Sequence, residues 1–338
     1  MKKKIITLLL AGLFIVSLSA CGKKADTASA IAPDEKKVVK LGFPGNSSFL
    51  GGISGIAEEK KYFDEELAKV GYKIQYVPFA AAGPAVNEAL AGNKVDLAIY
   101  ADFPGVVLKS KGIDIDLLGI TEDKIHSRVV VKNDSKIKSI KELKGKKIGF
   151  TKGTYMQKFL LQLVADNGLT DKDVQLVNMT TDAESALIAG NVDAIVQTDT
   201  QALTLISTKK VAKEIENTRN HTGWSAQSVF VGSHSYVKDN PLVPVAIDKA
   251  LLRARTYFKG NPNESYQILT KSGLNLTSIK EMYKSEAPDF KLFTVNTTAD
   301  SIKRLNDTQK FMFDQKLITD KFDNSKWVDN SYYEKAIK

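Results

Sequence analysis

The sequence predicts an α/β protein of two lobes, and three observations carry this prediction. Short β-rich runs alternate with amphipathic helical patterns from residue 38 onward, which is typical of α/β folds with largely parallel strands. The alternation forms two successive blocks that meet near residue 125. Each block also contains a similar phrase, EALAGNKVDLAIYAD at 88–102 and SALIAGNVDAIVQTD at 185–199. We interpret the phrase as one helix–turn–strand unit used twice; the alternative is a common turn repeated by chance.

The first block reads as four strands separated by three helices. Apolar residues of the first helical segment fall broadly on one face, as a helix packed on a sheet requires. We expect strands at 38–43, 73–79, 95–101 and 115–120, and helices at 52–70, 83–92 and 103–112.

The second block repeats this alternation, and a helical region follows it. Thr181 and Glu184 have the spacing of a capping box, which predicts a helix start there. Asn240 as N-cap and Pro241 at the first helical position begin another predicted helix. We expect strands at 127–132, 146–150, 174–179 and 192–198, helices at 139–144, 154–169, 181–190 and 241–260, and a strand-like run at 290–295.

The first twenty residues have the three-part order of a secretory signal. Lys2–Lys4 precede an apolar run at 5–16, which is shorter than the about 20 residues that a membrane-spanning helix needs. Leu18–Cys21, LSAC, looks like the lipobox of bacterial lipoproteins, in which the cysteine becomes the lipidated first residue. We therefore expect export and a palmitate-type acyl anchor at Cys21 on the outer face of the bacterial cytoplasmic membrane. The alternative is an ordinary signal with a chance cysteine.

The composition argues against several kinds of site. Cys21 is the only cysteine in 338 residues, so a mature disulfide, cysteine metal site or cysteine nucleophile is not expected. His126, His221 and His234 show no metal-ligand spacing, and we expect neither a metal nor another cofactor. The formal charge of +9 comes from lysines spread along the chain, without the basic stripe that nucleic-acid binding requires.

Several motifs resemble the solute-binding proteins of nitrate, sulfonate and taurine ABC importers, most of all the alkanesulfonate-binding branch. They are LGF at 41–43, VPFAAAGPAVNEALAGNKVDLAIYADFP at 77–104, IKSIKELKGKKIGFTKGTYMQKFLLQLVADNGLTDKDVQLV at 137–177 and GNVDAIVQTD at 190–199. The resemblance extends from about residue 38 to 327 and implies a type II periplasmic-binding-protein fold, two lobes joined by two crossover strands. The expected division is a signal peptide at 1–20, a flexible tether at 21–37, lobe 1 at 38–124, lobe 2 at 125–230, and the C-terminal helices of lobe 1 at 231–338.

The best-defined candidate site is TKGTYMQ at 151–157. It follows a predicted buried strand and opens a long helix, so the backbone N–H groups of Gly153, Thr154 and Tyr155 are expected to be free for an anion. The resemblance places a sulfonate or carboxylate head at this turn. The plain alternative is a capped helix start, because threonine is a common N-cap.

Other candidate ligand contacts lie on loops that follow the remaining strands. They are Asn46, Ser47, Ser48, Asp102, Phe103, Thr198, Asp199 and Trp224. The alkanesulfonate branch has Trp-Asp-Pro-Tyr where this chain has Thr198 to Gln201, so only Asp199 matches. Trp224 or Tyr155 would supply the missing aromatic surface, unless both are ordinary core residues. Asp102 and Asp199 read as acceptors for backbone N–H groups or a ligand amine rather than as catalytic carboxylates.

These features predict a non-enzymatic receptor for a small organic anion, such as an alkanesulfonate or taurine. The receptor is expected to be a monomer and to deliver its ligand to an ABC permease with its ATPase. Nitrate and pyrimidine or amine-bearing solutes are alternative ligands. Two other roles remain open: a sensor subunit, and an enzyme related to the pyrimidine synthases of thiamine biosynthesis. The enzyme is disfavoured because those proteins carry a cysteine-rich motif.

Overall fold

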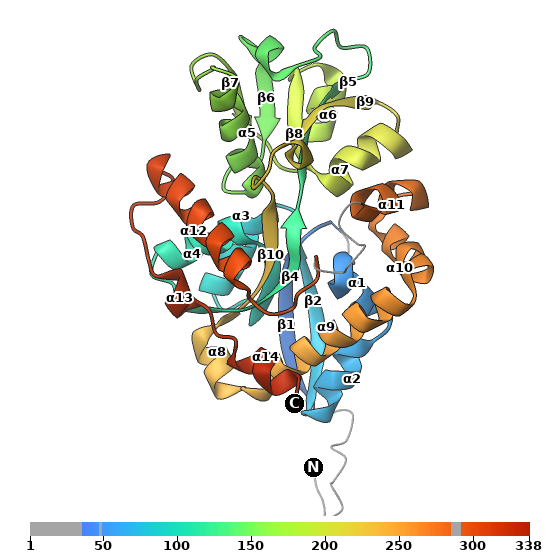
Figure 1. The fold of residues 1–338 in the computed structure, drawn as a ribbon, viewed down its shortest axis with the longest axis vertical. Coiled ribbons are helices and arrows are strands. Elements are labelled where there is room, and N and C mark those ends of the chain that lie inside the picture. Colours follow the sequence, from blue (N-terminus) through green and yellow to red (C-terminus); the bar gives the residue numbers. More distant parts are fainter. Residues whose placement is uncertain (1–35, 47–48, 285–291) are drawn as a thin grey trace, which may run out of the picture.

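Two five-stranded sheets form the centres of the two lobes in the computed structural model, which describes residues 36–46, 49–284 and 292–338 (Figure 1). The lobe 1 sheet has the order β2-β1-β3-β10-β4 and the lobe 2 sheet the order β7-β6-β8-β5-β9. The strands of lobe 1 are β1 Lys37–Pro44, β2 Tyr72–Phe79, β3 Leu97–Ala101, β4 Ile115–Ile125 and β10 Ala226–Ser233. Those of lobe 2 are β5 Ser127–Lys132, β6 Lys147–Phe150, β7 Gln175–Asn178, β8 Ala194–Thr198 and β9 Ala212–Asn217. The two sheets therefore share one pattern, in agreement with the predicted two-lobed α/β fold.

The lobes are joined by two crossovers that each run from an edge strand of one sheet to an inner strand of the other. The edge strand β4 continues through His126 into β5, and β9 returns through a short 3₁₀ turn, η4 Thr218–Asn220, to β10. β10 pairs antiparallel with both β3 and β4. Residues 226–230, which we expected in lobe 2, thus lie in the sheet of lobe 1. The sheets are mixed rather than largely parallel because these crossover strands run against their neighbours.

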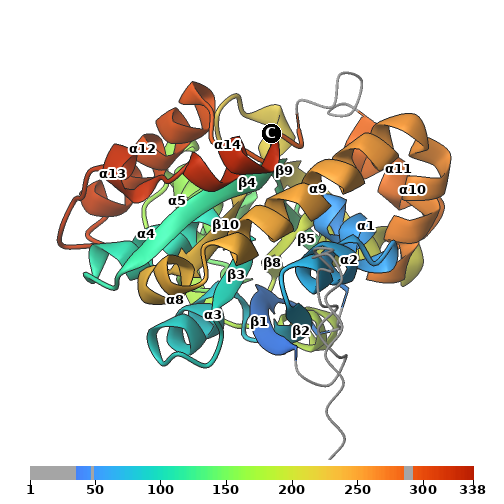
Figure 2. The same cartoon turned by 90° about the horizontal axis from the view of Figure 1, so that it is seen from below.

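Helices cover both faces of each sheet. In lobe 1, α4, α12 and α13 gather on one side and α1, α10 and α11 on the other (Figures 1 and 2). The helices of lobe 1 are α1 Gly52–Glu59, α2 Tyr62–Lys69, α3 Ala82–Ala91, α4 Asp102–Ser110, α8 His234–Asp239, α9 Leu242–Gly260, α10 Pro262–Leu269, η5 Thr270–Ser272, α11 Leu276–Lys284, α12 Ala299–Asp314, α13 Asn324–Trp327 and α14 Ser331–Ala336. Those of lobe 2 are η2 Ile140–Leu143, α5 Tyr155–Asp166, α6 Ala183–Ala189, α7 Asp199–Leu203 and η3 Thr204–Thr208.

The central strands alternate their side chains between two apolar cores, one on each face of the sheet. In β3, Leu97 and Ile99 enter one core of lobe 1, while Ala98 and Tyr100 enter the other. In β8, Ile195 faces the core opposite to that of its two neighbours in the strand. A strand buried on both faces reads as a continuous apolar run, as these two segments do.

The helix predicted at 52–70 is two helices, because the chain breaks at Lys61. Lys61 takes a left-handed backbone conformation with φ 58°, which ends α1 and begins α2. The Nζ atom of the preceding Lys60 lies 4.4 Å from the ring centroid of Tyr257 on α9. Packing on α9 therefore overrides a helical pattern that contains neither glycine nor proline at the break.

Two predicted caps were wrong. α6 begins after Asp182 without a side-chain cap bond, and Glu184 instead pairs with Lys209. α9 begins after Pro241, while the Asn240 amide donates to the carbonyl of Tyr236 at the end of α8. The strand-like run at 290–295 falls partly outside the described residues, and Val295 forms a single bridge to Ile120.

The repeated unit closes onto its sheet through the same bond in both lobes. Asp96 Oδ2 accepts the backbone N–H of Lys40 at 2.8 Å, and Asp193 Oδ2 accepts that of Lys147 at 2.8 Å. The backbone N–H groups of the two aspartates return bonds to the carbonyls of the same two lysines. The Val-Asp step therefore fixes the start of the central strand to its neighbour in each lobe.

Candidate ligand-binding cleft

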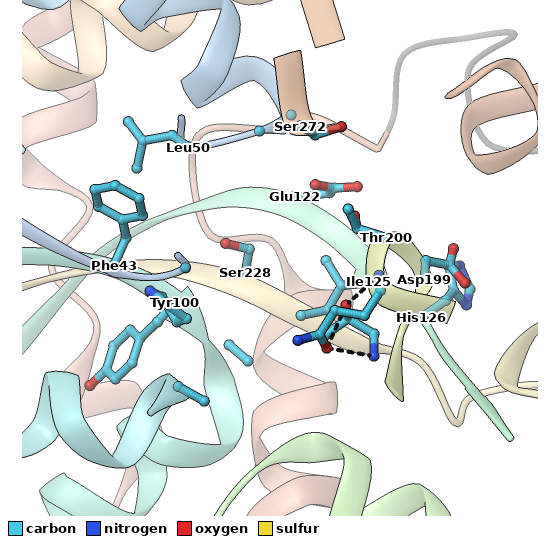
Figure 3. A pocket seen from close by; sticks show the side chains of 18 of the residues that line it. Phe43, Leu50, Tyr100, Glu122, Ile125, His126, Asp199, Thr200, Ser228 and Ser272 are labelled. Atoms are coloured by element: carbon cyan, nitrogen blue, oxygen red, sulfur yellow. Dashed lines mark hydrogen bonds between the residues drawn. The ribbon is translucent and has the colours of Figure 1, made fainter. Parts of the chain in front are cut away.

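A cleft of about 610 Å³ lies between the lobes, and both lobes contribute to its wall. It is bordered by the carboxyl ends of β1 and β3 from lobe 1 and of β6 and β8 from lobe 2, where ligands bind in open α/β sheets. Figure 3 shows Phe43 and Tyr100 of lobe 1 across the space from Thr200 and Asp199 of lobe 2. The wall combines apolar and aromatic side chains with few charges, as small-molecule sites do.

The structure brings five of the predicted contacts to the wall of this cleft. They are Asn46, Thr154, Tyr155, Thr198 and Asp199. Asp102, Phe103, Gly153 and Trp224 are not among the residues that line it. Ser47 and Ser48 lie outside the described residues, as does Cys21.

The first turn of α5 presents backbone donors to the cleft. Within the described residues, the amides of Thr154, Tyr155 and Met156 donate to no acceptor, and all three residues line the cleft. The Gly153 amide is occupied, because Gln157 Oε1 accepts it at 2.8 Å. The Thr154 hydroxyl donates to the carbonyl of Thr151 at 2.6 Å. The free amides and the helix dipole, about half a positive charge, therefore lie at the wall of the space between the lobes.

Asp102 lies behind the cleft wall, at the first position of α4. It is 1 % exposed and accepts a hydrogen bond from the Thr308 hydroxyl on α12 at 3.4 Å. The Lys158 Nζ, from α5 of lobe 2, donates to the same hydroxyl at 3.0 Å. Burial raises the pKa of Asp102 to about 6, although the Lys158 charge opposes this shift. A ligand in the cleft does not reach this carboxylate, since α4 and α12 of lobe 1 and α5 of lobe 2 together cover it.

Asp199 lines the cleft, but two arginines hold its carboxylate. Arg128 Nε donates to Oδ1 at 2.8 Å, and Arg219 Nη1 lies 2.6 Å from Oδ2. Arg128 also pairs with Glu214 at 2.5 Å and with Glu281 of α11 at 3.2 Å. Both oxygens of Asp199 are therefore engaged before any ligand amine arrives.

Thr198 and its neighbour Gln201 stabilise the start of α7. The backbone N–H of Gln201 donates to Thr198 Oγ1 at 3.2 Å, and the Gln201 side chain accepts the backbone N–H of Thr198, which completes a capping box. These residues stand where the alkanesulfonate branch has aromatic side chains, and they serve the helix start instead. Their hydroxyl and amide groups still line the cleft.

The two predicted aromatic contacts are packed within the lobes. Phe103 is 1 % exposed and belongs to a core of lobe 1. The Trp224 ring stacks on His221 with centroids 4.1 Å apart and meets the edge of Phe159. Phe103 is thus part of a core, one face of the Trp224 ring is covered by His221, and neither residue lines the cleft.

Sequence reasoning missed the residues that α1, β4, η4 and α11 bring to the cleft. Gly51 and Gly52, both with positive φ, place the first turn of α1 in the wall, and Arg219 enters from the return crossover. Ile279, Met282 and Tyr283 of α11, together with Glu122, Lys124 and His126 near the first crossover, complete it. The Gly51-Gly52 pair could have indicated a place where the backbone takes positive φ and approaches a ligand closely. Arg219, an arginine in a lysine-rich chain, could have indicated a paired or binding position. α11 carried no such signal, because its position depends on the fold of the whole lobe.

Two further features bear on the kind of site. No cluster of three or more His, Cys, Asp or Glu side chains that could hold a metal ion occurs in the described part of the chain. None of its helices is both long enough and apolar enough to cross a membrane.

Comparisons with known proteins agree with this geometry. The NMT1/THI5-like family model matches residues 53–265. A protein of Bacillus subtilis (strain 168), whose name describes it as an aliphatic sulfonates-binding protein, is 28% identical over 341 residues, covering 99% of this chain and 97% of its own length.

Solved structures share the fold at lower identity. The alkanesulfonate-binding protein SsuA from Xanthomonas axonopodis pv. citri, bound to MOPS, has a TM-score of 0.72 and 22% identity, covering 87% of this chain and 98% of that one. The desulfurization enzyme DSZB has a TM-score of 0.70 and 15% identity, covering 89% and 99%. The fold thus occurs in both a binding protein and an enzyme. With the family match spanning most of the chain and the two-lobed cleft in place, this protein belongs to the NMT1/THI5-like family.

Proposed function

We propose that this chain is the extracytoplasmic solute-binding lipoprotein of an ABC importer, and that it captures an alkanesulfonate in the cleft between its lobes. One observation carries the proposal: Thr154, Tyr155 and Met156, whose amides are free, line the cleft at the start of α5. A sulfonate has three oxygens to accept these donors and a charge that the helix dipole attracts. The similarity of the whole chain to a protein named for binding aliphatic sulfonates supports this choice.

The wall of the cleft favours an anion with an apolar body over taurine or nitrate. A volume of about 610 Å³ is far more than a nitrate ion fills. Taurine would need a partner for its ammonium, and the acidic residues of the wall, Asp199, Glu184 and Glu122, already interact with other groups of the protein. An alkyl or aromatic chain, in contrast, meets side chains such as Phe43, Leu50 and Ile125.

The remaining parts of the role follow from the N-terminal sequence and from the class of importer. Cys21 would carry the acyl anchor, the stretch at 21–37 would act as a tether, and the folded lobes would work as a monomer. The ligand would pass to a permease driven by its ATPase. An enzymatic role has less support, because the cleft supplies no cysteine and Asp102 and Asp199 are held by internal partners.

Titration calorimetry of the lipid-free mature protein tests the ligand class. We expect exothermic binding of linear and aromatic sulfonates, weaker binding of taurine, and none of nitrate or pyrimidines. Binding of pyrimidines without binding of any sulfonate would overturn the proposal. Partition of the full-length protein into detergent, lost in Cys21→Ser, would test the anchor separately.

A substitution at the start of α5 tests the proposed anion site, the free amides of Thr154, Tyr155 and Met156, which we call the anion seat. Thr154→Trp places a large ring over the free amides, so we expect sulfonate affinity to fall by at least about 100-fold, the scale of losing several charge-assisted bonds. Thr256→Trp, on the exposed side of α9, is the control and should bind normally. Unchanged affinity in Thr154→Trp would mean that the anion sits elsewhere in the cleft.

A further inference from the structure

A buried lysine of lobe 2 projects into lobe 1 beside the cleft. Lys158 lies in α5, one turn after the free amides, and is 5 % exposed. Its Nζ donates to Thr308 Oγ1 on α12 at 3.0 Å, and that hydroxyl donates to Asp102 Oδ2 at 3.4 Å. Neither Lys158 nor Asp102 lines the cleft. The contact therefore joins the two lobes without touching the space for the ligand.

The groups around this contact belong to three helices. Lys158 comes from α5, Asp102 from α4, and Thr308 from α12. Arg304 and Asp307 of α12 add charges that act on Asp102 and on Lys158 respectively. The Asp102 Oδ1 atom has no hydrogen-bond partner among the described residues. Lys158 thus supplies the positive charge by which lobe 2 attracts the Asp102 carboxylate of lobe 1.

We propose that Lys158, Thr308 and Asp102 form a clasp that exists only when the lobes are closed, and that Lys158 thereby positions the α5 anion seat and sets ligand affinity from outside the cleft. When the lobes part, both charges return to water, which is favourable for each of them. Closure must remove that hydration, and the attraction between the two charges offsets most of the loss, so the ligand-free protein samples the closed form. Ligand binding at the free amides of α5 adds to closure, so closure is coupled to occupancy.

The two titratable groups respond to pH in opposite directions. Burial raises the pKa of Asp102 to about 6, so closing takes up a proton as pH falls through 6, and closure strengthens at acid pH. Burial lowers the pKa of Lys158, although Asp102 opposes the shift, so closing releases a proton at alkaline pH. Above pH 6 Asp102 is charged, and its charge favours the protonated form of Lys158.

Single substitutions should therefore have mirror-image pH profiles. In Lys158→Met the Asp102 charge has lost its cation, so sulfonate affinity at pH 7.5 should fall about 10-fold, within the usual range of coupling between sites, and recover toward pH 5. In Asp102→Asn the Lys158 charge has lost its anion, so affinity should fall similarly and recover toward alkaline pH. The double variant buries no charge, so its affinity should return near the wild-type value and vary little with pH.

Lys172→Met, an exposed lysine of the same lobe, is the matched control and should behave as wild type. Small-angle scattering of the ligand-free proteins gives a readout that needs no ligand: Lys158→Met should be more open than wild type at pH 7.5, and the double variant should not.

The proposal rests on the proposed ligand-binding role for its affinity readout, and the two can fail separately. If wild type binds no sulfonate, the proposed function fails, and scattering still decides the clasp. If wild type and Lys158→Met bind sulfonates equally at every pH and scatter alike, the clasp is refuted and the function stands. A structural defect alone would lower affinity without the opposite pH profiles and without recovery in the double variant.

Discussion

The two copies of the helix–turn–strand unit end in aspartates that occupy equivalent places and do different work. Asp102 opens α4 in lobe 1, Asp199 opens α7 in lobe 2, and both are at most 5 % exposed. Asp102 faces a lysine from the opposite lobe through a threonine, whereas Asp199 binds Arg128 and Arg219. The position in the repeat thus determines where each carboxylate lies, and the cation that pairs with it determines its role.

Each aspartate stands at a bridge between the lobes, one on each side of the cleft. We name the contacts of Arg128 and Arg219 with Asp199 and α11 the arginine bridge, in contrast to the clasp of Lys158, Thr308 and Asp102. In this bridge, Arg128 reaches Glu281, and Arg219 Nη2 donates to the carbonyl of Met282 at 3.0 Å. Both acceptors belong to α11 of lobe 1.

The cation type separates the two bridges. Burial lowers the pKa of Arg128, but the charges of Asp199 and Glu214 outweigh it and raise the pKa overall. Burial also lowers the pKa of Lys158, and there the charges of Asp102 and Asp307 do not outweigh it. Arginine stays charged in proteins, while buried lysine deprotonates readily. The arginines of the arginine bridge therefore keep their charge, whereas the charges of the clasp respond to pH.

The largest expected effect is the loss of Arg128. Its side chain is 7 % exposed and faces Asp199, Glu214 and Glu281, so Arg128→Met leaves three carboxylates close together. We expect the free energy of unfolding to fall by about 3–5 kcal/mol, the scale for removing one partner of a buried pair. Urea unfolding measures it, with Lys310→Met as control, since that lysine is 72 % exposed and its partner Asp314 is 49 % exposed. Equal effects of the two substitutions would remove the distinction between a buried bridge and a surface pair.

A smaller effect is expected from Asp199→Asn. The amide keeps the shape but removes the charge that two arginines share, and we expect a loss of about 1.5–3 kcal/mol in unfolding free energy. Because arginine side chains stay charged in proteins, this loss of unfolding free energy should be constant from pH 6 to pH 9. A loss that disappears at alkaline pH would contradict the contrast with the lysine clasp, where recovery is expected.

The smallest effects are expected at the shared aspartates, Asp96 and Asp193. Asp96→Asn and Asp193→Asn each weaken one bond to a strand amide, worth about 1 kcal/mol. The two losses should be equal within error, because the bonds are the same length in both lobes. Unequal losses, measured by thermal unfolding, would show that the repeat is similar in sequence only.

Sequence patterns predicted the fold and the place of the cleft, but not the partners of the buried charges. The alternation of strands and helices located both sheets, and the strand–turn–helix at 147–166 predicted the turn that we propose as the anion seat. The roles of Asp102 and Asp199 were not readable, since their partners Lys158 and Arg128 lie 56 and 71 residues away along the chain. The residue type gave the one available indication of these partners, because arginine is rare in this lysine-rich chain and is well suited to buried ion pairs.

The helix break at Lys61 and the contribution of α11 were equally hidden. Both depend on α9 and α10, which follow in the chain after lobe 2 is complete. A local pattern reports periodicity and turn chemistry, whereas these features arise from contacts between distant segments. The paired glycines at 51–52 are the exception, because positive φ has a sequence signature.

The strand exchange at the crossovers has a consequence for the order in which the chain folds. All five strands of lobe 2 lie between residues 127 and 217, so that lobe has every strand it needs in one continuous stretch. Lobe 1 lacks an inner strand until β10 is made, and Val328 still has to reach Leu117 near the end of the chain. Long-range pairing of this kind forms slowly. As the chain is synthesised, lobe 2 can therefore assemble first, while lobe 1 still lacks β10 and the bridge from Val328.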